Sequence, residues 1–305
     1  MTQSRKNSIV GSIFLALAAI IWGSSFVAQT AGAEFVGPFT FISIRSFLGS
    51  AALLPVIFIM DTFKKKTKLQ EFKKMTKADY KYLLKGGLAC GIVLFAASNL
   101  QQLGIDGGTA PGMAAFITAL YILLVPIFSV FLGKKIRPVI WVCVGVSVVA
   151  LYLLCVKDGG RVQGSDLYVL ACAVCYAIHI LVIDKVSPKL DGIRLSALQF
   201  FVAGVISLIP MLIFEDVTLE ALKAAAPSIA YSGIMSSGVA FTLQILGQQK
   251  TEPTIATMLM SLESVFGVLT AMIILSQVPT ARETIGCVLM FAAIIVAQLP
   301  EKKKQ

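Results

Sequence analysis

Charged residues are scarce in this sequence. Only 14% of its 305 residues are Asp, Glu, Lys or Arg, whereas 57% are hydrophobic. A soluble domain of this length typically needs about a quarter of its residues charged. The composition therefore excludes an ordinary soluble globular protein, and lipid must solvate most of the surface.

The sequence also has little with which to build a metal or redox site. It contains one histidine and six cysteines, and the cysteines lie in or at the edges of hydrophobic runs, where they act as small apolar residues. Cys172 and Cys175 have the CxxC spacing of redox and metal sites, but other ligands are missing around them. We therefore expect no metal and no cofactor.

What the sequence does have is ten hydrophobic runs, each long enough to cross about 30 Å of hydrocarbon as a helix. The runs are continuous rather than alternating, which predicts helices and not a β-barrel. The first run exceeds the roughly 7–15 residues of a signal-peptide core, so it counts as a span. The fold class is all-α integral membrane, with spans near 9–29, 38–60, 83–103, 111–132, 138–156, 166–184, 195–214, 226–247, 254–275 and 284–299.

The formal charge of +10 is distributed unevenly along the chain. If the first helix runs outward, most of the 26 basic residues fall on the cytoplasmic side. This positive-inside pattern predicts a multi-pass protein of the inner or plasma membrane with both termini cytoplasmic. The densest group, from Lys64 to Lys85, is expected to contact anionic lipid rather than nucleic acid.

The second half of the chain resembles the first half. Residues 19–25 match residues 173–179, and residues 100–104 match residues 243–247. Each unit contains an odd number of spans, five, so consecutive copies enter the membrane from opposite sides and form an inverted repeat. Such repeats are typical of secondary transporters, whose substrate binds near the midplane between the halves. The predicted repeats are 9–157 and 165–300.

Four short motifs, in this order, resemble the drug/metabolite transporter superfamily, EamA type. They are Trp22-Gly23-Ser24-Ser25-Phe26, Arg45, Pro126 and Leu262-Glu263-Ser264-Val265-Phe266. The resemblance covers nearly the whole chain and implies two tandem five-helix domains that export or exchange small metabolites through a central cavity. The chain has Ser264 where the family often has Pro, and Lys134 and Gln277 where it often has an acidic residue.

Ionisable residues inside a membrane span are costly, so the three found here are candidates for function. Arg45 could attract an anionic substrate group, or it could pair, cap carbonyls or snorkel outward. His179, the only histidine, could bind a proton or substrate, or it could be a packing residue. Glu263 could be a proton site, or its carboxyl could fix helix packing.

Neutral polar residues form a second group of candidates. Several recur at helical spacing, which places them on shared faces. A mixture of aromatic rings, amides and hydroxyls suits an amino acid or related amphipathic solute. The alternative is ordinary contact between helices, worth about 0.6 kcal/mol on average in membranes. The group comprises Trp22, Ser25, Gln29, Asn99, Gln102, Thr118, Tyr121, Tyr176, Gln244 and Gln248.

These features favour a secondary transporter that moves a small molecule by alternating access. The sequence lacks a GxxxxGK[ST] motif and a loop that could hold an ATPase domain, so gradients or a separate subunit must drive transport. The main alternative is a membrane enzyme or flippase-like protein acting on a lipid-linked substrate, but clustered acid/base residues are missing. A third alternative is a channel or a signalling subunit. The sequence does not decide whether the protein forms a homodimer.

Overall fold

A computed structural model of the protein describes residues 3–66, 75–156, 163–275 and 280–299. Within these ranges the chain forms helices and no strand. Ten helical segments of the described chain are long and apolar enough to cross a membrane. The predicted all-α membrane fold is therefore confirmed.

The first five spans use six helices. They are α1 (Gln3–Ala33), α2 (Pro38–Lys66), α3 (Lys77–Asp106), α4 (Pro111–Thr118) with α5 (Tyr121–Phe131), and α6 (Pro138–Cys155). The fourth span is broken, since the chain leaves α4 at Ala119 and starts α5 only at Tyr121.

The second five spans have the same plan with one further irregularity. They are α7 (Asp166–Val186), α8 (Gly192–Phe214), α9 (Leu219–Ala230) continued by η2 (Tyr231–Ala240) and α10 (Phe241–Gln248), α11 (Pro253–Met260) with α12 (Leu262–Leu275), and α13 (Ala281–Gln298). A short 3-10 turn, η1 (Ser187–Lys189), follows α7, and η2 is wound as a π-helix. The ninth span is broken at Ser261, as the fourth is at Ala119 and Leu120.

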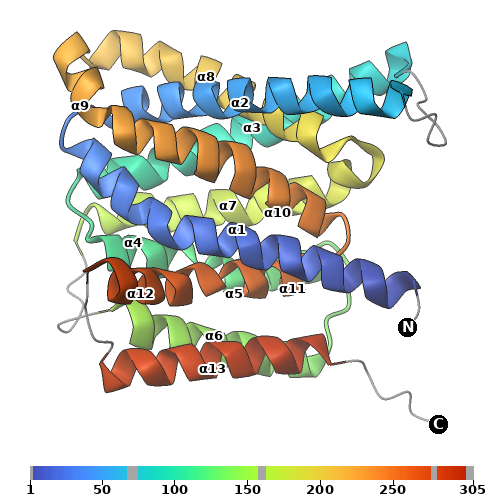
Figure 1. The fold of residues 1–305 in the computed structure, drawn as a ribbon. Helices are drawn as coiled ribbons and strands as arrows, with labels where there is room; N and C mark the ends of the chain where they lie inside the picture. The colour runs from blue at the N-terminus through green and yellow to red at the C-terminus, as the bar shows by residue number, and fades with distance from the viewer. Residues whose placement is uncertain (1–2, 67–74, 157–162, 276–279, 300–305) are drawn as a thin grey trace.

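The two halves run in opposite directions through the bundle. Because α1 and α3 are separated by one span, they end on the same side. Thr109, just after α3, donates a hydrogen bond of 2.8 Å to Asp166, the first residue of α7. The second half therefore starts on the side of the bundle at which α1 ends. This is the arrangement of an inverted repeat (Figure 1).

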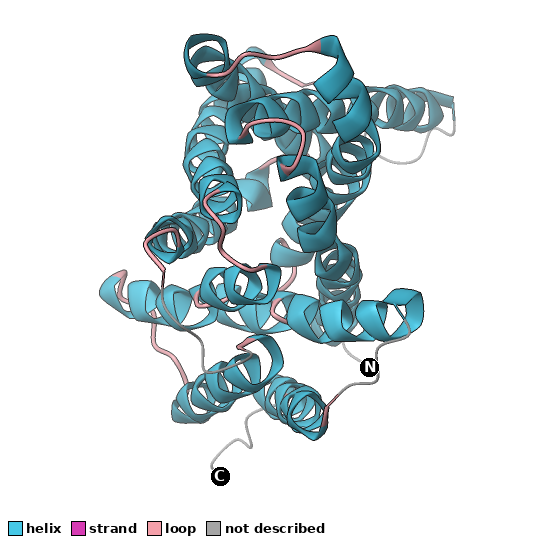
Figure 2. Ribbon diagram, turned by 90° about the vertical axis from the view of Figure 1, so that its left-hand side faces the viewer, coloured by secondary structure: helices cyan, strands magenta, loops and turns pink. Residues whose placement is uncertain are grey.

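Two pairs of equivalent helices form opposite edges of the molecule, α2 with α8 and α6 with α13 (Figures 1 and 2). Polar contacts join the first pair at both ends. Asp61 forms an ion pair of 2.6 Å with Arg194, and the Glu215 carboxylate accepts hydrogen bonds from the first-turn amides of Phe39 and Thr40. The remaining helices fill the space between the two edges.

Within that central part, α1 packs closely against α12. A Cβ atom added to Gly23 would lie 2.7 Å from the backbone oxygen of Glu263 and 2.8 Å from the nitrogen of Gly267. Small residues permit such close approach between membrane helices. The Gly23 position therefore brings the first helix of one repeat against the broken span of the other.

Candidate functional site

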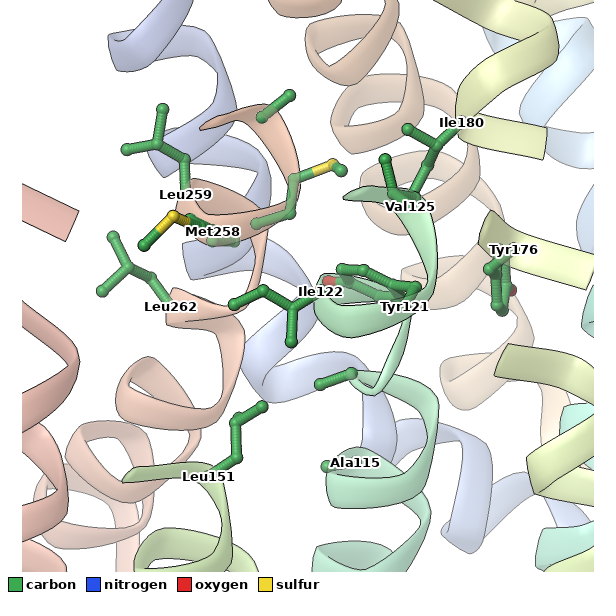
Figure 3. Packing of buried hydrophobic residues seen from close by; sticks show 14 of the residues in the cluster. Ala115, Tyr121, Ile122, Val125, Leu151, Tyr176, Ile180, Met258, Leu259 and Leu262 are labelled. Carbon is green, nitrogen blue, oxygen red and sulfur yellow. The ribbon is translucent and has the colours of Figure 1, made fainter. Parts of the chain in front are cut away.

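The broken spans of the two repeats meet in the centre of the molecule. Tyr121 starts α5 and Glu263 lies in the first turn of α12. The Tyr121 hydroxyl donates a hydrogen bond of 3.2 Å to Glu263 Oε1. In Figure 3 the Tyr121 ring extends from α5 toward the ribbon that carries Met258 and Leu262. Discontinuous helices at matching places in two inverted repeats are the usual location of a transporter's binding site.

A cavity lies beside this hydrogen bond. It encloses about 480 Å³ of space between atoms, a figure that includes space open to solvent and is therefore an upper bound on a ligand. Both repeats contribute to its lining. The lining residues are Trp22, Ser25, Phe26, Gln29, Arg45, Gln101, Thr118, Tyr121, Tyr176, Ile180, Ser236, Phe241, Gln244, Met260 and Glu263.

The cavity lies among buried residues. Every lining residue is buried except Trp22, which is partly buried. The site therefore belongs to the interior of the helix bundle.

One basic and one carboxylic side chain line the cavity. Arg45 donates from Nη1 to Gln29 Oε1 at 3.0 Å, and its guanidinium carbon lies 5.9 Å from the centre of the Phe41 ring. The Glu263 carboxyl accepts the hydrogen bond from Tyr121. Among the described residues neither side chain forms an ion pair. The cavity thus contains one cationic and one acidic group that do not neutralise each other by direct contact.

Three further lining residues carry a buried polar atom that has no hydrogen-bond partner in the described part of the chain. These atoms are Trp22 Nε1, Ser25 Oγ and Gln244 Oε1. Buried polar groups are usually paired, and each exception requires an explanation, such as a water molecule or a ligand. The three atoms offer one donor, one acceptor and one hydroxyl that can do either.

Aromatic rings form another part of the wall. The Trp22 and Phe241 rings meet edge to face with centroids 4.9 Å apart, and Phe200 packs behind Phe241 at 5.1 Å. Such pairs contribute about 0.5–1.5 kcal/mol beyond the burial of their area. The wall therefore offers a rigid apolar surface next to the polar groups.

Eight of the eleven residues predicted from the sequence as cavity candidates line this cavity, as does Thr118. They are Trp22, Ser25, Gln29, Arg45, Tyr121, Tyr176, Gln244 and Glu263. The structure brings these residues together from α1, α2, α5, α7, α10 and α12.

The other three candidates lie outside the lining. Asn99 donates to Ser207 Oγ at 2.8 Å, and Gln102 donates to the backbone oxygen of Gln29 at 3.3 Å. His179 is fully buried, and its Nε2 lies 3.0 Å from Gln199 Oε1. Its ring centroid is 6.2 Å from that of Phe241, so it lies one layer behind the cavity wall. Gln248, the last polar residue considered, donates to the backbone oxygen of Ile180 at 3.0 Å.

Several lining residues were not predicted, and one of them could have been. Gln101 lines the cavity and donates to Thr118 Oγ1 at 3.0 Å. In the internal repeat Gln101 occupies the same place as Gln244, which also lines the cavity. The internal repeat could therefore have identified Gln101 as a cavity residue. Phe26, Ile180, Phe241 and Met260 looked like ordinary apolar span residues, and Ser236 falls in the unexpected π-helical segment.

Metal binding was considered above for the cysteines. Cys172 is buried, with its sulfur 4.0 Å from Thr118 Oγ1. In the described ranges no group of three His, Cys, Asp or Glu side chains is arranged to hold a metal ion.

Comparison with known proteins gives two matches to one family model. The EamA-like transporter family matches residues 9–156 and again residues 163–298, which together cover most of the chain. The two matches correspond to the two halves described above.

Individual proteins are similar at lower identity. An uncharacterized transporter of Archaeoglobus fulgidus is 27% identical over 288 residues, which is 93% of this chain and 84% of that protein. The uncharacterized inner membrane transporter YedA of Escherichia coli K12 is 23% identical over 243 residues, 78% of this chain and 74% of that protein. A solved structure described as "Crystal structure of protein" superposes with a TM-score of 0.74 at 18% identity, covering 95% of this chain and 98% of the other. This last similarity concerns the fold alone.

Proposed function

This chain belongs to the EamA-like transporter family, and we propose that it is a secondary carrier that exports or exchanges a small amphipathic metabolite by alternating access. The observation that supports this most is the buried cavity between the two inverted repeats. Alternating access requires a site that each half can expose in turn to one side of the membrane. The cavity lies where such a site is needed, next to the breaks in both broken spans.

The lining supports an amino acid or a related solute as the substrate. Arg45, Glu263 and the unpaired atoms of Trp22, Ser25 and Gln244 can bind charged and polar groups. The Trp22 and Phe241 rings can bind an apolar portion. The space available, at most about 480 Å³, supports a small solute as the substrate rather than a lipid-linked molecule.

The driving force is proposed to be a proton gradient acting through Glu263. A proton site must alternate between charged and neutral forms inside the membrane, and a carboxyl held by one neutral hydroxyl can do so without breaking an ion pair. His179 remains the second proton candidate. Its Nδ1 has no hydrogen-bond partner among the described residues, and it lies behind Tyr176 and Phe241.

The chain is a multi-pass membrane protein, and we place it in the inner or plasma membrane with both termini in the cytoplasm. The start of α1 and the end of α13 lie at the same end of the bundle as the end of α2 and the start of α3 (Figure 1). Lys77, Lys81 and Lys85 are exposed at the start of α3, where they could contact anionic lipid. The predicted basic residues Lys68, Lys73, Lys74, Lys302, Lys303 and Lys304 lie outside the described residues, as do Lys157, Arg161 and Gln277.

The carrier proposal is tested by counterflow in proteoliposomes. Vesicles containing the purified protein are preloaded with one unlabelled amino acid and diluted into a trace of the same amino acid carrying a radiolabel. A carrier exchanges the two and accumulates label transiently above equilibrium, whereas a channel only equilibrates it. Accumulation with at least one amino acid, absent from protein-free vesicles, is the expected result. Equilibration without accumulation, for every amino acid that enters, would refute the carrier.

A further inference from the structure

We propose that Arg45 is the receptor for a carboxylate group of the transported solute, so that the cavity selects carboxylate-bearing solutes and rejects the corresponding amides. This inference deepens the proposed function and rests on it. It assigns a role to the one buried cation of the cavity, and it names the chemical group that the substrate must carry.

The geometry leaves most of the Arg45 guanidinium available. A guanidinium has five N–H donors, and within the described ranges only the one that bonds Gln29 Oε1 is used. Nε and Nη2 make no hydrogen bond with described residues. Neither atom is completely buried by the protein. Arg45 is one of the residues that line the cavity, so its unused donors lie close to the space in which a solute would bind.

The charge of Arg45 is also uncompensated. The side chain is only 3% exposed, and no acidic side chain of the described residues pairs with it. A buried ion without a partner costs several kcal/mol. The neighbouring Phe41 ring offers only a weak attraction at 5.9 Å. An anionic ligand group would remove this cost, so the cavity favours such a group.

A structural role alone explains less of what is observed. Arg45 does hold the Gln29 amide, and Gln102 in turn bonds the Gln29 backbone oxygen. This contact needs one donor, which a neutral glutamine could supply without a buried charge. The four donors that remain, and the position on the cavity wall, are unexplained by packing.

A carboxylate fits the site better than a phosphate does. The planar guanidinium matches a carboxylate through two parallel hydrogen bonds. A dianionic phosphate would bring two negative charges to one cation, in a cavity that already contains the acidic side chain of Glu263. Phosphate groups are often bound by more than one cationic side chain, whereas Arg45 is the one basic residue in this lining.

The test compares each amino acid with its own amide. Leucine, threonine and phenylalanine, and the matching leucinamide, threoninamide and phenylalaninamide, are added to the detergent-purified protein, and thermal unfolding is recorded. A ligand that binds the folded state raises the unfolding temperature by mass action. We expect at least one amino acid to raise it and its amide to fail. This comparison uses the wild-type protein and does not depend on whether a variant folds.

A substitution then connects the effect to the residue. Arg45→Gln keeps a donor for Gln29 and removes the charge, and it should weaken binding of the stabilising amino acid by on the order of tenfold or more. Arg282→Gln is the matched control, because Arg282 donates to the backbone oxygen of Tyr152 and lies outside the cavity lining. It should bind the amino acid as the wild type does.

The outcomes separate this inference from the proposed function. Equal stabilisation by an amino acid and its amide, or full binding in Arg45→Gln, would overturn the carboxylate assignment while counterflow could still establish a carrier. Stabilisation by none of the six compounds would overturn the assignment too. If counterflow also fails with every amino acid, the proposed function fails with it.

Discussion

Glu263 and Tyr121 provide the sharpest prediction at the scale of single residues. Glutamine at position 263 keeps an acceptor for the Tyr121 hydroxyl but cannot exchange a proton. We therefore expect Glu263→Gln to abolish the dependence of net amino-acid flux on an imposed pH gradient, while counterflow continues. The measurement is flux into proteoliposomes with and without the gradient.

The control for this prediction is Glu252→Gln. Glu252 precedes α11, is exposed and lies outside the cavity lining. Its variant should respond to the gradient as the wild type does. A Glu263→Gln protein whose flux still follows the pH gradient would show that the coupling proton binds elsewhere.

His179 leads to a different prediction, because it lies behind the cavity wall. Removing its ring leaves Gln199 Oε1 without a partner in a fully buried place, at a cost of about 1–3 kcal/mol. We expect His179→Ala to insert into the membrane, to unfold at a lower temperature and to transport more slowly. Flux is measured per folded molecule. Unchanged flux alongside lower stability would make His179 a packing residue only.

The candidate residues illustrate what helical spacing can predict. The stripe of Trp22, Ser25 and Gln29 lines the cavity because one face of α1 points to the centre. On α3 the same reasoning selected Asn99 and Gln102, whereas the structure places Gln101 on the cavity. Spacing finds residues that share a face, but the rotation of each helix depends on its packing partners, which a single sequence does not contain.

At the scale of helices, the close contact between α1 and α12 is testable by substituting Gly23. The Cβ of alanine at position 23 would lie under 3 Å from the backbone of α12, so the helices must separate. We expect Gly23→Ala to lower the free energy of unfolding by roughly 1–3 kcal/mol, as overpacking does, and to reduce flux. Reversible unfolding in detergent measures the first effect.

Gly145→Ala serves as the matched control. Gly145 lies on α6, and no described residue comes within 4 Å of the position of an added Cβ. Alanine there should leave stability unchanged or raise it slightly, since alanine favours helix more than glycine does. Equal effects of the two substitutions would contradict the proposed contact.

The breaks in the fourth and ninth spans could not be predicted from the hydrophobic pattern. The sequence shows one continuous apolar run in each case, and neither break contains a proline or glycine. Pro126 lies within α5, whereas the span is interrupted before it, at Ala119 and Leu120. The interruptions lie where the two repeats meet, a place that the hydrophobic pattern does not indicate, and the same pattern gives no sign of the π-helical segment in the eighth span.

At the scale of the whole molecule, the orientation of the chain follows from its basic residues and is open to direct measurement. Reporter proteins that are active on only one side of the membrane are fused to the N-terminus, to the C-terminus and between α8 and α9 at Asp216. We expect both termini to report the cytoplasm and position 216 to report the opposite side. Termini on opposite sides would contradict an even number of spans.

The sequence predicted the architecture more fully than the site. Long apolar runs, the positive-inside bias and the weak internal repeat are global features, and they suffice for a ten-span inverted repeat. The cavity depends on which side chains of six helices meet, and on the burial of Arg45 and Glu263 without ion-pair partners in the described part of the chain. These features can be recognised only from the three-dimensional structure.

The central claim is that the substrate binds in the cavity between the repeats. It is tested most directly by an experimental structure of the protein determined with the most stabilising amino acid. The account predicts ligand density bounded by Arg45, the Trp22 ring and Glu263, with the carboxylate against the guanidinium. Density for the ligand at any other place, with this cavity filled only by water, would contradict it.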